Sequence, residues 1–273
     1  MKINDFAMIT QEIFERAVPA FAAPDSFTFD RLSGFLESAK AEVDTLCGDF
    51  IPADDPSRLR LVCLAAAVLA VPHLDLALTP TGFGVVSNTH TVPASPVRVE
   101  NLLKSLKFVQ SSTEDNIIMG RLTHTAWSNT PQASQIISLL LFCPTVCRTY
   151  GVPCQSRDDF TTLRPKLTAA DLRISQTIST ELLEEVLEDI RTGQSKPPIF
   201  ATLAHKLRTA AALLVHPEGR TEEDINRTLQ DAKGFVQRHS SDFLAFTNSS
   251  AAAADKINAA RTPQEYETAF FFG

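Results

Sequence analysis

The glycines of one short stretch are the first residues whose spacing could support chemistry. Residues 78–88 read Leu-Thr-Pro-Thr-Gly-Phe-Gly-Val-Val-Ser-Asn. A dinucleotide-binding loop needs G-x-G-x-x-G between a strand and a helix, but Ser87 occupies the third glycine position and the preceding residues predict a helix. We therefore predict no nucleotide cofactor. The stretch is instead expected to form a shaped loop that packs Phe83 or presents it to a neighbouring subunit.

Three cysteines form the second candidate group, Cys143, Cys147 and Cys154, out of five in the chain. Their spacing matches no common zinc site and no histidine follows nearby. The five cysteines are also too few and too irregular for a disulfide framework. We predict reduced, buried thiols and no metal site. A metal-dependent enzyme built on these three cysteines is the weakest of the functional hypotheses.

Acidic residues between Ile178 and Ile190 form the third group. They alternate with apolar residues at helical spacing, and comprise Glu181, Glu184, Glu185, Glu188 and Asp189. Paired carboxylates could do acid and base work if they were buried, but a solvated face opposite a core stripe explains this pattern better. No G-x-S-x-G motif and no histidine pair at metal-binding spacing occurs. We predict no catalytic residues and no enzyme activity.

Composition limits the remaining function classes. The 273 residues are 44% hydrophobic, the net charge is −7 and the pI is near 5.4. A nucleic-acid partner is not expected from this acidic balance. The most apolar run, Leu61–Leu74, is too short to span a membrane, and the N-terminal residues lack a secretory signal pattern. These features predict a protein of the cytoplasm.

The apolar periodicity predicts mostly helices in the first half. One begins near Thr10, and Gly48 is a natural end for another. The predicted helices are Phe29–Cys47, Ser57–Leu78, Arg98–Val109, and one from Glu114 that resumes over Pro131–Phe142. Pro72 is expected to kink the helix over Ser57–Leu78, and residues 123–131 are expected to break the helix that begins at Glu114. Trp127, inside the break, is expected to be a packing anchor.

Four further helices are predicted in the second half, over Phe160–Ile174, Ser179–Ile190, Pro197–Leu214 and Glu222–Arg238. Residues 251–260 and Pro263 indicate a flexible lead-in to the tail. The predicted fold is all-α, a multi-helix bundle in two packed halves with one short extended segment near residues 83–88. The predicted domains are residues 1–155, residues 156–250, and a tail over residues 251–273.

Several segments together carry a family resemblance. They are Asp75–Asn88 with Val92–Ser95 and Arg98–Val99, then Ile178–Leu183, Val236–Phe246 and Phe270–Gly273. With them the chain resembles an uncharacterised family of Bacteroidetes prophage and phage structural proteins. Within Val236–Phe246 the chain departs from the family, with Leu244 where a proline is expected. The resemblance implies a virion structural or assembly protein, such as a head–tail connector or tail-completion adaptor.

The residues expected to make protein contacts are the loop residues Thr79, Pro80, Gly82, Phe83 and Gly84 together with Phe270, Phe271 and Phe272. Three exposed phenylalanines would cost solubility, so they are expected to be buried, either on the same subunit or in a neighbour. The resemblance implies portal, tail or neighbouring subunits as partners, a homo-oligomer in the assembled state, and location in the bacterial host cytoplasm and then the virion. The alternative is a monomeric helical binding module that does not enter the particle.

Overall fold

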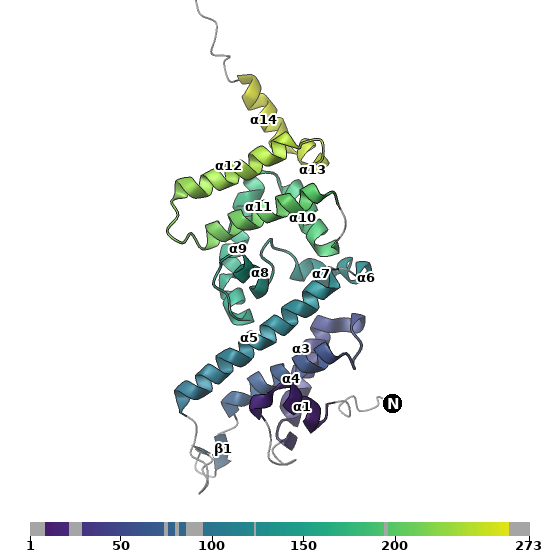
Figure 1. Ribbon diagram of the computed structural model, residues 1–273, viewed down its shortest axis with the longest axis vertical. Helices are drawn as coiled ribbons and strands as arrows, with labels where there is room; N and C mark the ends of the chain where they lie inside the picture. The colour runs from purple at the N-terminus through teal and green to yellow at the C-terminus, as the bar shows by residue number, and fades with distance from the viewer. Residues whose placement is uncertain are drawn as a thin grey trace, which may run out of the picture. The chain divides into compact units, whose positions relative to one another are not determined.

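The computed structural model describes residues 9–21, 29–73, 76–79, 82–85, 95–122, 124–193 and 196–261. Within these ranges the chain is dominated by helices (Figure 1), and the predicted all-α fold is confirmed. The contacts divide the chain into two compact units. Unit 1 comprises residues 1–121, 143–145 and 154–161, and unit 2 comprises residues 122–142, 146–153 and 162–273. The predicted boundary near residue 155 stays a prediction.

The core of unit 1 is built on helix α4 (Pro56–Ala70), which packs against α3 (Ser33–Cys47) and α5 (Pro96–Arg121). Asp55 begins α4 because its carboxylate accepts the N–H groups of Ser57 and Arg58. The residues from Leu61 to Ala67 are all buried, so α4 is apolar on every side. Helix α1 (Gln11–Ala17), capped by Thr10 as predicted, packs on α4 and contributes Phe14 to the core.

Helix α4 ends earlier than predicted. The helix expected to reach Leu78 stops at Ala70 and is followed by a 3₁₀ turn, η4 (Val71–His73). Pro72 explains the stop, because it lacks the N–H that the next helical bond needs. Residues 76–79 then form strand β1 (Leu76–Thr79), which pairs antiparallel with β2 (Gly82–Val85). The extended segment predicted near residues 83–88 is confirmed up to Val85, and its remainder lies outside the described residues.

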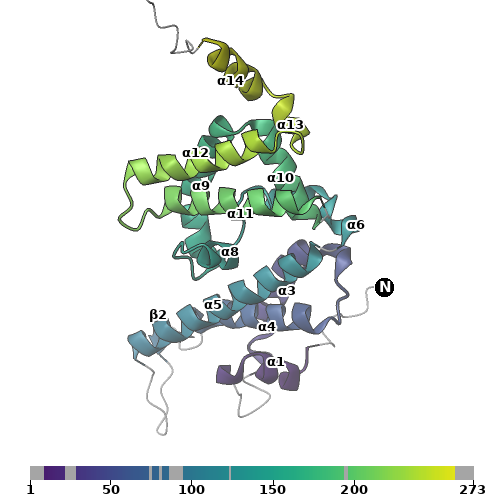
Figure 2. The ribbon, with the colours of Figure 1, turned by 45° about the horizontal axis from the view of Figure 1, so that its top comes forward.

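Helix α5 corrects a second prediction. Two helical segments separated after Val109 were expected, but α5 is one continuous helix of 26 residues. It begins at Pro96, two residues before the predicted start at Arg98, and proline suits the first position of a helix. In Figures 1 and 2, α5 runs beside α4, and the hairpin lies near the N-terminal end of α5. Buried residues of α4 and α5 belong to the same hydrophobic core.

Unit 2 contains the four helices predicted for the second half of the sequence. They are α9 (Arg157–Thr177, its first residues in unit 1), α10 (Thr180–Thr192), α11 (Pro198–Val215) and α12 (Glu222–Arg238). Ser179 caps α10, and Thr221 with Asp224 forms a capping box on α12. Within the unit, α11 packs on both α10 and α12. Two short helices, α8 (Pro144–Thr149) and α13 (Leu244–Thr247), complete the connections.

The helix predicted over Pro131–Phe142 is wrong beyond Ile136, where α7 (Pro131–Ile136) ends. Residues 139–142 are buried but not helical. Tertiary bonds replace the helical ones there: the Leu140 N–H donates to Asp171 at 2.9 Å, and its carbonyl accepts from Arg208 Nε at 3.1 Å. Both partners lie far along the chain, so the local pattern could not reveal this ending.

The segment predicted as a flexible lead-in is helical in the described residues. Helix α14 (Ser250–Arg261) begins where the Ser249 hydroxyl accepts the Ala252 N–H. Asp255 ties this helix to α12 through Lys233 at 2.7 Å and Gln237 at 3.0 Å. Alanines favour the helix because they lose no side-chain entropy in it. Pro263 lies outside the described residues.

Candidate functional site

The hairpin gathers most of the loop residues expected to make contacts. In its register Thr79 faces Gly82, Leu78 faces Phe83, and Ala77 faces Gly84. Two of the four residues of β2 are glycines, Gly82 and Gly84, which suits close approach of the backbones. Pro80 and the three tail residues Phe270, Phe271 and Phe272 lie outside the described residues. The contact role of all eight residues stays a prediction.

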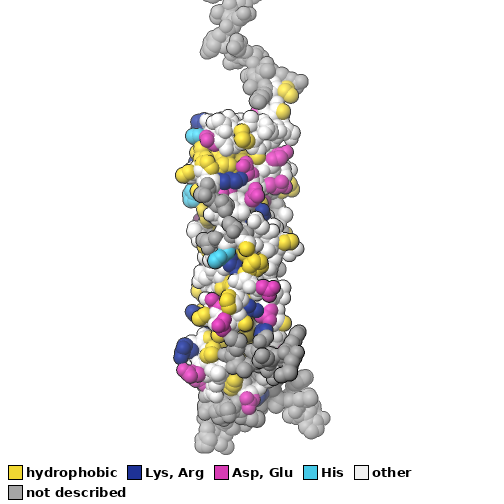
Figure 3. All heavy atoms as spheres, turned by 90° about the vertical axis from the view of Figure 1, so that its right-hand side faces the viewer, with side chains coloured by type: hydrophobic (Ala, Val, Ile, Leu, Met, Phe, Trp, Pro, Cys, Tyr) yellow, Lys and Arg dark blue, Asp and Glu magenta, His cyan; other side chains and the backbone are white. Residues whose placement is uncertain are grey.

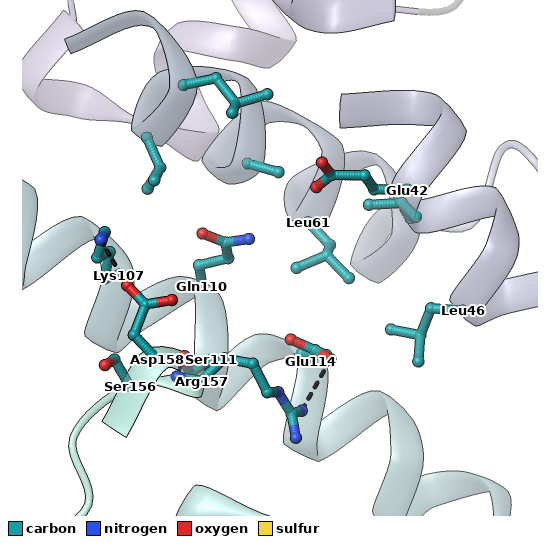
Figure 4. Close-up of a pocket in the computed structure, with 14 residues that line it drawn as sticks. Glu42, Leu46, Leu61, Lys107, Gln110, Ser111, Glu114, Ser156, Arg157 and Asp158 are labelled. Atoms are coloured by element: carbon teal, nitrogen blue, oxygen red, sulfur yellow. Dashed lines mark hydrogen bonds and ion pairs between the residues drawn. The ribbon is translucent and has the colours of Figure 1, made fainter. Parts of the chain in front are cut away.

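A cavity of about 360 Å³ lies among α3, α4, α5 and the start of α9 (Figure 4). One wall is apolar and comes from α3 and α4, with Val43, Leu46, Leu61, Ala65, Val68 and Leu69. The other wall is polar and comes from α5 and α9, with Lys107, Gln110, Ser111, Glu114, Ser156, Arg157 and Asp158. Glu42 of α3 also lines it. Pockets of this size and mixed lining are typical of sites for small ligands or partner side chains.

The polar wall is fixed by hydrogen bonds between α5 and the start of α9. The Arg157 backbone N–H donates to the Ser111 hydroxyl at 2.8 Å. Asp159 accepts the N–H groups of Gln155 and Ser156, both at 2.9 Å, which satisfies donors that a helix start leaves free. The first turn of α9 is therefore held in place on α5, and with it the side chains of residues 157 and 158.

Arg157 joins two carboxylates of α5. Its Nη2 lies 2.8 Å from Glu114 and 3.1 Å from Asp115, whose side chain is fully buried. Asp115 also accepts the Thr145 N–H at 2.7 Å. Burial raises the pKa of Glu114, Arg157 opposes that shift, and the nearby charges of Asp115 and Glu42 add to it. One guanidinium of the cavity lining is thus shared between Glu114, which also lines the cavity, and the buried Asp115.

The remaining charges of the cavity leave it with surplus negative charge. Lys107 pairs with Asp158 at 2.6 Å, so both basic side chains of the lining are already engaged. Glu42 forms no ion pair with any described residue. The Arg157 Nε–H is buried and finds no hydrogen-bond acceptor within the described ranges. An unpaired carboxylate and an unsatisfied donor therefore border the same cavity, which is the arrangement expected of a site that awaits a ligand.

The cysteines behave as predicted for buried thiols. All five are buried and free of disulfides. Burial raises the pKa of Cys63 to about 12 and also raises that of Cys47, so neither thiol is activated as a nucleophile. The described part of the chain contains no group of three or more histidine, cysteine or acidic side chains arranged to hold a metal ion. We therefore assign the thiols a packing role.

The acidic face of α10 is confirmed as a solvated face over most of its length. Glu181, Glu184 and Glu188 are exposed, while the buried residues of the helix are Leu182, Leu183 and Val186. Glu185 pairs with Lys196 at 3.0 Å. Elsewhere on the surface, acidic and basic side chains are interspersed over the face drawn in Figure 3. Trp127 is fully buried, which confirms its prediction as a packing anchor.

Sequence reasoning missed the cavity entirely. Its charged residues lie on α5 and the start of α9, about 40 residues apart in sequence, and no local motif links them. The sequence analysis predicted a helix over Phe160–Ile174, but this prediction did not show what the start of α9 packs against. The charged side chains of α5 otherwise resemble an ordinary solvated face.

The structure thus defines an all-α protein whose first unit contains a cavity lined by α3, α4, α5 and the start of α9. A protein-family model described as a family of unknown function (DUF6712) matches residues 59–117, which run from α4 through the hairpin into α5. No curated protein and no solved structure matches the chain. None of the helices within the described ranges is long and apolar enough to cross a membrane.

Proposed function

We propose that the chain is a non-enzymatic structural or assembly protein of a phage or prophage particle, of the head–tail connector or tail-completion type. In this role it forms a homo-oligomer and binds portal, tail or neighbouring subunits, first in the host cytoplasm and then in the virion. The phage setting is supported by the family resemblance of Asp75–Asn88 and the later segments. The proposal assigns no catalytic residue and no cofactor.

The observation that carries the proposal is the fold of the stretch that matches the family model. Residues 59–117 comprise most of α4, the two paired strands and most of α5, so the part of the chain that matches the family model is a pair of packed helices with a β-hairpin between them in sequence. Scaffolds with a short projecting element suit docking between subunits, because the helices fix the geometry and the hairpin supplies the contact. The Gly82-Phe83-Gly84 segment and the Phe270–Phe272 tail are the proposed contacts.

The charged groups of the described chain also support a structural role. Arg157, Glu114 and Asp115 hold α9 on α5, and in unit 2 Asp171 and Arg208 hold the backbone of Leu140. These buried groups are thus used to fix elements in place.

The cavity of unit 1 favours a second candidate function, a monomeric helical module of a phage or bacterium that binds a partner through this hollow.

The molar mass of the protein separates the two candidates. Light scattering would compare the full chain with a version ending at Tyr266 and with Phe83→Ser, using Phe50→Ser as the matched control because Phe50 is an exposed phenylalanine of unit 1 outside the hairpin. We expect the full chain and Phe50→Ser to form a defined oligomer. The version ending at Tyr266 and Phe83→Ser should form smaller species. A full chain that is monomeric at every concentration would contradict the oligomeric proposal and leave the monomeric module.

A further inference from the structure

The cavity of unit 1 has not yet been assigned a ligand or a partner group. We infer that it binds the long cationic side chain of a protein partner, with a lysine as the occupant. This inference rests on the proposed function as an assembly protein, because it names the group that a partner inserts. It concerns only described residues of unit 1.

The apolar wall fits the stem of a lysine. Leu61 and Ala65 are each 2% exposed and Val43 is 4% exposed, so this wall is the surface of the unit 1 core. Lysine side chains commonly lay their four methylenes on apolar surface while the ammonium group remains in a polar environment. The cavity volume of about 360 Å³ accommodates such a chain together with part of its backbone.

The polar wall fits an ammonium head. Three carboxylates line the cavity, those of Glu42, Glu114 and Asp158, against two basic groups, and both basic groups are already in ion pairs. In Figure 4 the Glu42 carboxylate and the Gln110 amide both border the open space. An ammonium placed between them would gain oxygen acceptors and offset the surplus negative charge. An anionic ligand would instead meet uncompensated carboxylates.

The Arg157 guanidinium favours a protein partner over a free amine. Its buried Nε–H lacks an acceptor among the described residues, and leaving such a donor unsatisfied is costly. A peptide brings backbone carbonyl groups that can accept this hydrogen bond, whereas a simple alkylamine brings none. A lysine of a protein partner would then contact the apolar wall and the carboxylates, while its backbone carbonyl accepts the Arg157 Nε–H.

The test uses the full chain with labelled methyl groups and follows NMR shifts of Leu46, Leu61, Val68 and Leu69 during titration. The probes are n-pentylammonium and Nα-acetyl-lysine amide, with pentanoate and pentan-1-ol as matched controls for charge. We expect both cationic probes to shift these methyl signals and the two controls to leave them unchanged. Binding of n-pentylammonium without Nα-acetyl-lysine amide would overturn the protein partner, and equal effects of all four probes would overturn the cationic ligand.

Two variants of α3 complete the test. Glu42→Gln removes the unpaired carboxylate without changing its shape and is expected to weaken binding of Nα-acetyl-lysine amide about fivefold or more. Glu37→Gln makes the same change on an exposed residue of α3 outside the cavity, and should leave the affinity unchanged. Equal affinity for both variants would overturn the inference. Because the molar mass is measured separately, an oligomer that binds no cationic probe would refute this inference while leaving the proposed function intact.

Discussion

Two buried carboxylates, one in each unit, are stabilised in different ways. Asp115 in unit 1 is fully buried, lies 3.1 Å from the Arg157 guanidinium and also accepts the Thr145 N–H. Asp171 in unit 2 is 7% exposed and accepts the Leu140 N–H, and burial raises its pKa to about 7. The comparison shows two uses of a buried carboxylate: Asp115 forms a joint between α5 and α9 through Arg157, whereas Asp171 accepts a backbone N–H and burial makes its charged form less favourable.

The largest effect is expected in the pH dependence of stability. The unfolded Asp171 ionises near pH 3.8 and the folded one near pH 7, so its contribution to the free energy of unfolding falls as the pH rises from about 4 to about 7. About three pH units at about 1.4 kcal/mol each give a decrease of up to about 4 kcal/mol. Urea unfolding of the wild type and Asp171→Asn at pH 4, 5.5, 7 and 8 measures it.

The Asp171→Asn variant should lack this part of the dependence of the free energy of unfolding on pH. Its amide does not titrate but still offers an oxygen to the Leu140 N–H. Above pH 7 the contribution of Asp171 is constant, so the two curves should run parallel there. Identical slopes for the wild type and the variant between pH 4 and 7 would show that Asp171 titrates as an ordinary surface acid.

The next largest effect is expected at the joint that Asp115 forms with Arg157 in unit 1. Asp115→Ala leaves the Thr145 N–H without its acceptor and Arg157 with one carboxylate fewer, and should lower the free energy of unfolding by about 3 kcal/mol. Asp158→Ala is the control, since Asp158 forms an exposed pair with Lys107 and should cost less than about 1 kcal/mol. Equal losses in the two variants, measured by urea unfolding at pH 7, would remove the distinction between the buried joint and a surface pair.

The smallest stability effect is expected at Glu42. Its side chain is exposed and unpaired with any described residue, so Glu42→Gln should change the free energy of unfolding by no more than about 0.5 kcal/mol. The same variant is expected to weaken binding of a cationic probe. A loss of more than about 1 kcal/mol in thermal or urea unfolding would identify Glu42 as a structural residue and contradict its assignment to a ligand site.

Much of the fold follows from local sequence signals, and the site does not. Apolar periodicity predicted the helices of the second half, because each pattern lies within its own helix; the caps that the structure shows there, Ser179 on α10 and Thr221 on α12, are equally local. The predictions went wrong where distant residues replace local bonds, as Asp171 and Arg208 do at Leu140, and where Pro72 ended a helix instead of kinking it. The cavity depends on contacts of Arg157 with α5, which no pattern within either segment encodes.

Native mass spectrometry of the full chain from about 1 to 100 µM tests the central claim, that the protein assembles with copies of itself, most directly. The assembly account predicts one defined oligomer that grows with concentration at the expense of the 29.9 kDa monomer. A spectrum that contains only monomer over the whole range would contradict it and favour the monomeric binding module.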